Sequence, residues 1–382
     1  MHPLRLLPVA LGLLVAVPAA HAADPAPAPA EIARAIQQGS DFVKARAKDA
    51  FEDETFHETG ELTVLTLAHC GANMKDDAFA KGLAFLEKVE PRYTYRTALL
   101  AMALAEVNPR RYQWKIAHCA QWLVDTQLAG GEWGYPGTVQ GSQRKPEGVR
   151  VAPPPPPEGT EPGAAPLPQA RILVTKRSSI TTSGVARGDF SNTQFAILGL
   201  RACREAGVEV PKETWKAALD YVRKWQRPDG GWGYVIAGEP DESSYASLTC
   251  AGVCSLAIAL NALGTKDVKA DAGLKKGLGW LDGHLDLAQN VGIEASSVLG
   301  PSPWQYYHLY SLERVGRVLS LDTVGKHAWY AEGARWLLSN QQGDGHWADA
   351  EIRGSRPSYF TVADTCFALL FLTRATRPIT GP

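Results

Sequence analysis

The chain has 382 residues, with 39 Lys and Arg against 40 Asp and Glu, which leaves a net charge of −1. This near-neutral balance excludes the strongly basic surfaces that bind nucleic acid or an anionic membrane through charge alone. Six cysteines do not form the pattern of a disulfide scaffold in a chain of this length, and we expect them to be buried as small apolar residues.

Residues 1–22 have the pattern of a secretory signal. A short head that carries Arg5 precedes an apolar run that ends at Ala20, and Ala20 and Ala22 form an A-x-A cleavage site. The apolar run is short and broken by prolines, so we expect no transmembrane segment. We therefore expect an exported protein, periplasmic or secreted, with residues 23–30 as a disordered lead-in.

One short pattern recurs six times along the chain: a small residue, two variable residues, an aromatic residue, then Leu or Val. Each copy lies in an amphipathic helical pattern and is followed by a second, more apolar helical pattern. Internal repetition of this kind predicts stacked helix pairs. The aromatic residues of the six copies are Phe42, Phe85, Trp122, Tyr221, Trp280 and Trp336.

The six pairs predict six hairpins, each with an outer helix that has one wet face and an inner helix buried on most sides. An open stack of repeats would need polar caps, which the sequence does not show, so we expect a closed ring. The predicted fold is all-α, an (α/α)6 toroid that spans residues 31–376 as a single domain. Residues 134–187, rich in Pro and Gly, are expected to form a loop that leaves the rim. The hairpins are expected near residues 31–70, 77–106, 111–206, 212–263, 271–318 and 327–374.

Three copies of the pattern continue into a common ending, Gln-x-x-x-Gly-x-Trp. We interpret this ending mechanically: the Gln bonds free carbonyls at the end of the outer helix, the Gly permits a turn, and the Trp packs against the neighbouring pair. The residues of the three endings are Gln127, Gly131 and Trp133, then Gln226, Gly230 and Trp232, then Gln341, Gly345 and Trp347.

These motifs resemble the squalene cyclase and prenyltransferase superfamily of α/α toroids. The three endings are similar to that family's QW repeat, and the segments SNTQFAILGL and ADTCFALLFL resemble its inner-helix signature. The resemblance extends over nearly the whole mature chain and implies the toroid fold. It implies little about activity, because one toroid supports many chemistries. Triterpene cyclases of the family use a D-x-D-D acid that this sequence lacks, so an ordinary squalene-to-hopene cyclase is not expected.

The resemblance also suggests a zinc site. Protein prenyltransferases of the family bind zinc with a D-x-C at the start of one inner helix and a His at the start of another, and Asp364 and Cys366 match the D-x-C. In a closed ring the next inner helix is the first, where Thr59 holds the position of the family's His and His57 lies two residues earlier. Asp364, Cys366 and His57 would then be three zinc ligands, and the fourth coordination position of the zinc would be open. The alternative is that Asp364 caps its helix and Cys366 is core, with no cofactor.

The N-terminal ends of the inner helices should line a funnel mouth, where free N–H groups favour polar or anionic ligands. The candidate catalytic carboxylates are Asp364, Asp189 and Glu61, and two carboxylates that face each other there would suit acid–base chemistry. The alternative for Asp189 is a helix cap. Aromatic side chains beside them suit an apolar or saccharide ligand. The candidate ligand-binding residues are Tyr95, Tyr245, Trp304, Tyr306, Tyr307 and Tyr359.

One inner-helix pattern carries charge as well. Tyr306, Tyr310 and Glu313 are spaced to share one helix face. A Glu on an inner helix needs a partner or a ligand, and the nearby Arg314 and Arg317 favour a structural ion pair.

Three functions fit the sequence. The first is an exported toroid that binds an isoprenoid or other apolar ligand in its funnel, with or without cyclase or transferase chemistry. The second is a periplasmic carbohydrate-active toroid, a lyase or a hydrolase. The third is a non-enzymatic scaffold that binds a protein partner.

Overall fold

The structure is a computed structural model that describes residues 26–52, 59–135, 150–151, 171–175, 188–236, 239–240, 243–293, 304–349 and 358–379. The predicted signal, residues 1–22, lies outside these ranges, as do His57 and most of the predicted loop 134–187. Within the described residues, no helix is both long and apolar enough to cross a bilayer.

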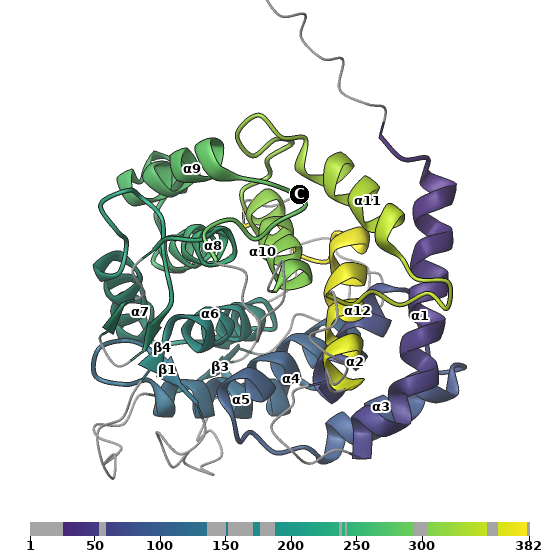
Figure 1. Cartoon of the computed structure of the whole chain (residues 1–382). Coiled ribbons are helices and arrows are strands. Elements are labelled where there is room, and N and C mark those ends of the chain that lie inside the picture. The colour runs from purple at the N-terminus through teal and green to yellow at the C-terminus, as the bar shows by residue number, and fades with distance from the viewer. Residues whose placement is uncertain are drawn as a thin grey trace, which may run out of the picture.

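Twelve α-helices alternate between an outer and an inner layer in the described part of the chain (Figure 1). The outer helices are α1 (Pro29–Glu52), α3 (Asp77–Lys88), α5 (Gln113–Thr126), α7 (Lys212–Lys224), α9 (Ala272–His284) and α11 (Trp329–Asn340). The inner helices are α2 (Thr59–His69), α4 (Thr94–Val107), α6 (Phe190–Glu205), α8 (Ala246–Ala262), α10 (Gln305–Val318) and α12 (Ser358–Thr373). A short 3-10 helix, Val268–Ala270, precedes α9.

The inner helices form a closed ring. Each contacts two inner neighbours, in the order α2, α4, α6, α8, α10, α12, and α12 returns to contact α2. Outer helix α1 likewise contacts α11 and α12, so the first hairpin lies against the last (Figure 1). The prediction of an all-α (α/α)6 toroid is therefore confirmed.

The two layers differ in sequence as their positions require. The outer helix α7 buries Trp215, Leu219 and Val222 on one face and carries Lys, Arg, Glu and Asp on the other. The inner helix α8 has no charged residue, and nearly all of its side chains are buried. Because an inner helix meets helices on both sides, it needs apolar residues around most of its circumference.

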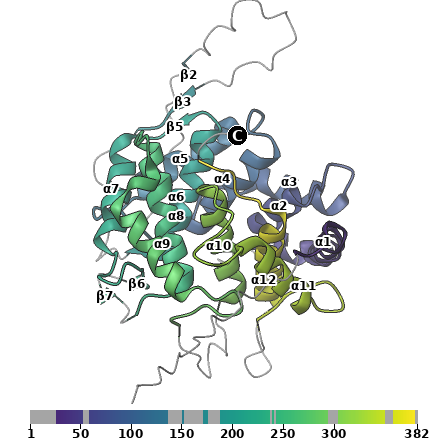
Figure 2. The ribbon, with the colours of Figure 1, turned by 90° about the horizontal axis from the view of Figure 1, so that it is seen from above.

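Two small sheets, which the sequence patterns did not predict, lie at opposite ends of the barrel (Figure 2). In the first sheet β1 (Trp133–Gly134), β4 (Gly188–Asp189), β6 (Val235–Ile236) and β7 (Glu239–Pro240) pair in that order, all antiparallel. In the second, β3 (Arg171–Leu173) pairs antiparallel with β2 (Arg150–Val151) and parallel with β5 (Val208–Glu209). Two short segments of the predicted loop thus form β2 and β3, and β3 pairs with the strand that follows α6.

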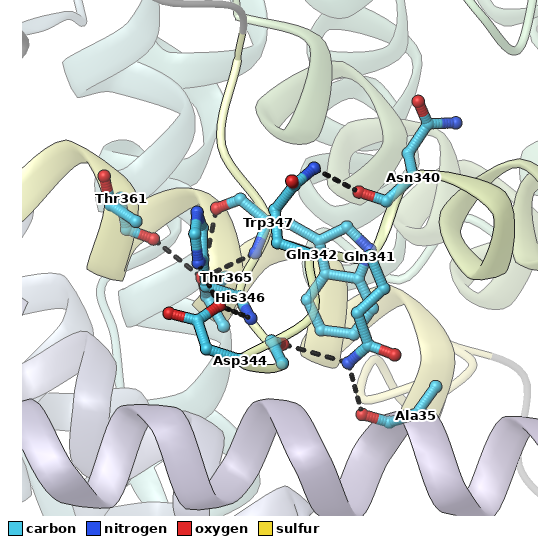
Figure 3. A network of polar contacts seen from close by, with 10 residues as sticks. Ala35, Asn340, Gln341, Gln342, Asp344, His346, Trp347, Thr361 and Thr365 are labelled. Atoms are coloured by element: carbon cyan, nitrogen blue, oxygen red, sulfur yellow. Dashed lines mark hydrogen bonds and ion pairs between the residues drawn. The ribbon is translucent and has the colours of Figure 1, made fainter.

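The Gln of each Gln-x-x-x-Gly-x-Trp ending joins two neighbouring hairpins. At the junction of the last hairpin with the first, Gln341 Nε2 donates to Gly345 O and to Ala35 O of α1, each at 2.9 Å (Figure 3). Gln127 and Gln226 donate to corresponding pairs of carbonyls. The sequence analysis placed the free carbonyls on the Gln's own helix. The extended backbone at this C-cap instead directs the side chain to the next outer helix.

The Trp of each ending is fully buried. The indole of Trp347 donates to a carbonyl of α11 at 2.9 Å, and its backbone N–H donates to Thr365 Oγ1 at 3.1 Å. Trp133 and Trp232 make the corresponding bonds. A Cβ added to Gly39, the small residue of the first repeated pattern, would lie 2.6 Å from the Trp347 ring. The small residue therefore makes room for the Trp of the preceding hairpin.

The Gly of each ending allows two outer helices to approach closely. Gly345 has a φ of +94°, and a Cβ there would lie 2.4 Å from Gln38 O of α1. Gly131 and Gly230 have φ values of +97° and +94° and meet the backbones of α7 and α9 in the same way. A side chain is excluded at these positions both by the backbone conformation and by the neighbouring carbonyl.

Residues 374–379 cross the end of the barrel at which the inner helices finish. Both carboxylate oxygens of the buried Glu313 accept hydrogen bonds from Thr376, from its N–H at 3.0 Å and from its hydroxyl at 2.7 Å. The side chains of Arg201 and Arg317 donate to carbonyls of the same segment. The expected ion pair of Glu313 with a neighbouring arginine is therefore wrong: the C-terminal segment binds this carboxylate instead.

Candidate functional site

Asp189 lies at the mouth end of the barrel, where β4 runs into α6. It is the N-cap of α6, with Oδ1 accepting from the Asn192 N–H at 2.9 Å and from the Ser191 hydroxyl at 2.7 Å. Oδ2 accepts from Asn192 Nδ2 at 2.6 Å. Burial raises the pKa of this carboxyl above its ordinary value, although these hydrogen bonds oppose the shift. Asp189 thus has the capping role considered for it and is also a carboxyl that takes up a proton more readily than usual.

Two tyrosines lie near this carboxyl. Asp189 is among the groups that, after burial, raise the pKa of the phenols of Tyr95 on α4 and Tyr234. Burial, followed by the acidic groups nearby, raises the pKa of both phenols, so they remain protonated.

Five aromatic side chains meet inside the ring, and we call them the aromatic cluster: Tyr95, Phe195, Tyr307, Tyr310 and Phe367. The ring centroids of Tyr95 and Phe195 are 4.5 Å apart, those of Phe195 and Tyr307 are 6.5 Å apart, and those of Tyr310 and Phe367 are 5.4 Å apart. Tyr307 and Phe367 also meet edge to face at 5.9 Å. The contact between Phe195 of α6 and Tyr307 of α10 joins two inner helices that have α8 between them in the ring.

Part of the aromatic cluster remains accessible. Tyr95, Tyr307 and Phe367 are only half-buried, although the outer layer covers the outer sides of their helices. Their remaining exposed surface therefore faces the barrel interior. These three residues are therefore the aromatic side chains of the cluster that a ligand in the interior could contact.

A buried arginine lies against the aromatic cluster. Arg314 on α10 is 0% exposed, and its guanidinium carbon is 4.1 Å from the Tyr310 ring centroid and 5.7 Å from that of Phe195. It donates to Ser311 Oγ at 2.7 Å, while its Nε and Nη1 atoms have no hydrogen-bond partner among the residues that the structure describes. Within the described part of the chain, no carboxylate forms an ion pair with it.

The other two predicted carboxylates, Glu61 and Asp364, each have a different partner within the fold. Glu61 is fully buried on α2, where its Oε1 accepts from Arg96 Nε at 2.9 Å. Burial raises the pKa of the Glu61 carboxyl, and the Arg96 charge opposes this shift. Asp364 lies inside α12 and accepts through Oδ2 from the Asp349 N–H at 3.1 Å. Asp364 is therefore not a helix cap, because α12 begins at Ser358, almost two turns earlier.

The predicted zinc ligands are described only in part, because His57 lies outside the described residues. Cys366 is fully buried on α12. Burial raises the pKa of this thiol to about 12, whereas zinc binds the thiolate. Among the described residues, no three His, Cys, Asp or Glu side chains are grouped as metal ligands.

The other predicted ligand-binding residues fall into different places. Tyr306 does not face the funnel: it packs against Trp336 of α11 at 5.7 Å, and its hydroxyl donates to Ala348 O at 3.3 Å. Trp304 is 41% exposed and begins α10 with a φ of 61°, and Tyr245 is the N-cap of α8. Tyr359 lies in the first turn of α12, and its side chain is outside the described part.

The sequence analysis did not name Phe195, Phe367, Gln194 or Arg314 as site residues. The available signal was the helical spacing of α10, on which Tyr307, Tyr310 and Arg314 recur at i, i+3 and i+7. The face named in the sequence analysis, Tyr306, Tyr310 and Glu313, shares only Tyr310 with this one, although Tyr307 was predicted separately as a ligand-binding residue. For Phe195 and Phe367, an aromatic residue within an apolar helix gives no sign of whether it faces the outer layer or the axis.

A separate cavity of about 90 Å³ lies at the opposite end of the barrel, under residues 375–377. Tyr310 lines it from the inside, and His69, Glu106 and Arg201 line it near the ends of their helices. Tyr310 thus belongs both to the aromatic cluster and to the lining of this cavity.

Comparison with known proteins supports the fold. No protein-family model and no curated protein sequence matches the chain. Among solved structures, the type II terpene cyclase MstE from Scytonema is 13% identical with a TM-score of 0.51, over 91% of this chain and 99% of that one. An MstE variant in complex with geranylgeranyl dihydroxybenzoate, its substrate, is 12% identical with a TM-score of 0.52, over 91% and 96%.

A second similar structure is a possible member of the GH105 family from Salmonella enterica subsp. enterica serovar Paratyphi A. It is 11% identical with a TM-score of 0.51, over 97% of this chain and 98% of that one. Identities this low show a shared toroid fold and do not transfer an activity.

Proposed function

We propose that the protein binds an isoprenoid-like apolar molecule in the central funnel. The observation that carries this proposal is the aromatic cluster, whose half-buried members Tyr95, Tyr307 and Phe367 present ring faces to the barrel interior. Aromatic faces match the flat, apolar surface of a polyprene chain and stabilise cationic centres formed along it. The similar toroid MstE binds geranylgeranyl dihydroxybenzoate, which has such a chain.

If the funnel also supports chemistry, Asp189 is the carboxyl best suited to donate a proton. Burial raises its pKa, and it lies near Tyr95 of the aromatic cluster. The proton would pass to an alkene carbon of the ligand, and the resulting cation would lie against the aromatic rings. The D-x-D-D acid of triterpene cyclases is absent, so the donor would differ from theirs.

The carbohydrate alternative is weaker. It would be supported by two carboxylates facing each other across the funnel. Glu61 is paired with Arg96, and Asp364 accepts a backbone hydrogen bond, so each has a partner within the fold. The structural similarity to a possible GH105 protein is the observation that favours this alternative, and we rank it below the isoprenoid proposal.

The binding proposal is tested with geranylgeraniol, by calorimetry on the purified protein. We expect saturable binding that Tyr307→Leu weakens by about tenfold, since one lost aromatic contact is worth about 1–1.5 kcal/mol. Tyr330→Leu is the matched control, because Tyr330 is also half-buried and also contacts a Phe of α12, but from the outer helix α11. Equal loss in both variants, or no binding by the unaltered protein, would contradict the proposal.

Proton transfer is tested separately with Asp189→Asn, since Asn also caps helices well. In D2O, deuterium incorporation into geranylgeraniol products should be lost in this variant while its thermal stability is retained. Unchanged incorporation would leave Asp189 with a capping role alone.

Export is also part of this proposal, on the strength of the sequence of residues 1–22. Expression in a bacterial host should yield a periplasmic protein whose N-terminal residue is Ala23. Retention of the intact N-terminus in the cytoplasm would refute it.

A further inference from the structure

Among the described residues, three nitrogen donors beside Tyr307 have no hydrogen-bond partner, and they belong to two side chains. They are Nε and Nη1 of Arg314 and Nε2 of Gln194. Both residues are buried, at 0% and 1% exposed. The Arg314 guanidinium is 5.8 Å from the Tyr307 ring centroid, and Gln194 Oε1 accepts from the Tyr307 hydroxyl at 2.5 Å. The donors of α6 and α10 are thus grouped around one tyrosine of the aromatic cluster.

The positive charge of Arg314 is poorly balanced. The neighbouring Glu313 directs both oxygens to Thr376, and no other carboxylate in the described ranges pairs with the guanidinium. The ring of Tyr310 and the Ser311 hydroxyl provide partial compensation. Buried polar groups in folded proteins nearly always have partners, and a buried charge without one is strongly unfavourable.

We propose that Arg314 and Gln194 bind an oxyanion carried by the apolar ligand. This inference rests on the proposed function, because it concerns one end of the same ligand. The unpartnered atoms are all donors, and therefore select a group with acceptors only, namely a carboxylate or a phosphate monoester. The anionic end lies beside Tyr307, and the apolar chain extends over Tyr95 and Phe367 toward the mouth.

The inference is tested with three ligands that share one chain: geranylgeraniol, geranylgeranoic acid and geranylgeranyl phosphate. Calorimetry should show that at least one of the two anions binds the unaltered protein roughly 10- to 100-fold more tightly than the alcohol, as expected for hydrogen bonds to a charged group. Which anion has the larger advantage identifies the oxyanion as carboxylate or phosphate.

The variants Arg314→Met and Gln194→Leu remove the donors while keeping the side chains near their original size. Both should reduce the advantage of the anion over the alcohol, and Arg314→Met should abolish it. The control is Arg223→Met, on the outer helix α7, where the arginine pairs with Asp271 at 2.7 Å. This control should keep the full advantage.

Thermal unfolding of the free protein supplies a second readout. Arg314→Met should be as stable as the unaltered protein or more stable, because it removes a buried charge that lacks a partner. Marked destabilisation together with an unchanged anion advantage in Gln194→Leu would overturn the inference and make Arg314 a packing residue.

The outcomes distinguish this inference from the proposed function. If all three ligands bind the unaltered protein equally, the oxyanion site is refuted and the apolar funnel stands. An anion advantage that persists in Arg314→Met refutes the assignment to Arg314. If none of the three binds, both proposals fail.

Discussion

Replacement of Gly345 by Ala should open the junction between the first hairpin and the last. The added Cβ would lie 2.4 Å from Gln38 O of α1, far closer than van der Waals contact allows. Because the obstructing atom belongs to the backbone of a 24-residue helix, it cannot move aside alone, and α1 must shift as a unit. Gln341 would then lose its hydrogen bond to Ala35 O.

The magnitude follows from these contacts. A φ of +94° in a residue other than glycine costs about 1–3 kcal/mol. Loss of the hydrogen bond from Gln341 to α1 removes about 1 kcal/mol more. We therefore expect Gly345→Ala to lower the free energy of unfolding by about 3 kcal/mol, before any loss of packing between α1 and α11 is counted.

Gly343→Ala is the control, because it lies in the same turn and a Cβ there has no neighbour within 4 Å. Its free energy of unfolding should stay within about 0.5 kcal/mol of the unaltered value. Urea unfolding followed by tryptophan fluorescence compares the two variants, and hydrogen exchange should show faster opening of α1 in Gly345→Ala alone. Two variants of equal stability would refute this account of the junction.

Three further predictions concern buried polar groups. Burial raises the pKa of Glu313 to about 7 from 4.5, so the folded chain keeps a proton that the unfolded chain releases between these values, and stability falls as pH rises through this window. Relative to the unaltered protein, Glu313→Gln should therefore gain up to about 3 kcal/mol between pH 4.5 and pH 8 in urea titrations, and a pH-independent difference would contradict the assigned pKa. Cys366, whose thiol pKa burial raises to about 12, should resist a thiol-specific disulfide reagent at pH 8 until urea unfolds the protein; rapid labelling of the native state would show that the thiol is accessible. Thr249→Val leaves the buried N–H of Trp232 without its acceptor and should cost about 1–3 kcal/mol in thermal or urea unfolding, whereas Thr373→Val, which loses bonds only to its own helix, should cost less than half as much.

The sequence determined the architecture because the repeat encodes contacts between hairpins. The small residue, the Gln, the Gly and the Trp each have a fixed partner on a neighbouring element, as Gly39 and Trp347 show. A pattern that encodes contacts also encodes closure of the ring. The strands β2 and β3 were missed because they are only two and three residues long, too short for a period-2 pattern to be recognised.

The site was predicted less well, for a related reason. Inner helices are apolar on most sides, so their hydrophobic pattern does not show which side faces the axis. Tyr306 and Tyr307 are adjacent tyrosines, yet one packs against α11 and the other belongs to the aromatic cluster. Arg314 gave no signal of its own, because its lack of an ion pair depends on Glu313, which binds Thr376 near the far end of the sequence instead.

The junction between α11 and α1 has a consequence for chain connectivity. The bonds of Gln341 to Gly345 and Ala35 are the same as those that Gln127 and Gln226 make at junctions the chain passes through. The junction between α11 and α1 forms without a peptide connection across it. A covalent connection could therefore be added there and removed at another junction. The toroid should therefore tolerate circular permutation in which residues 374–379 are kept after α12 and a linker joins them to the start of α1. New termini opened between α2 and α3 would then leave every hairpin in its original place.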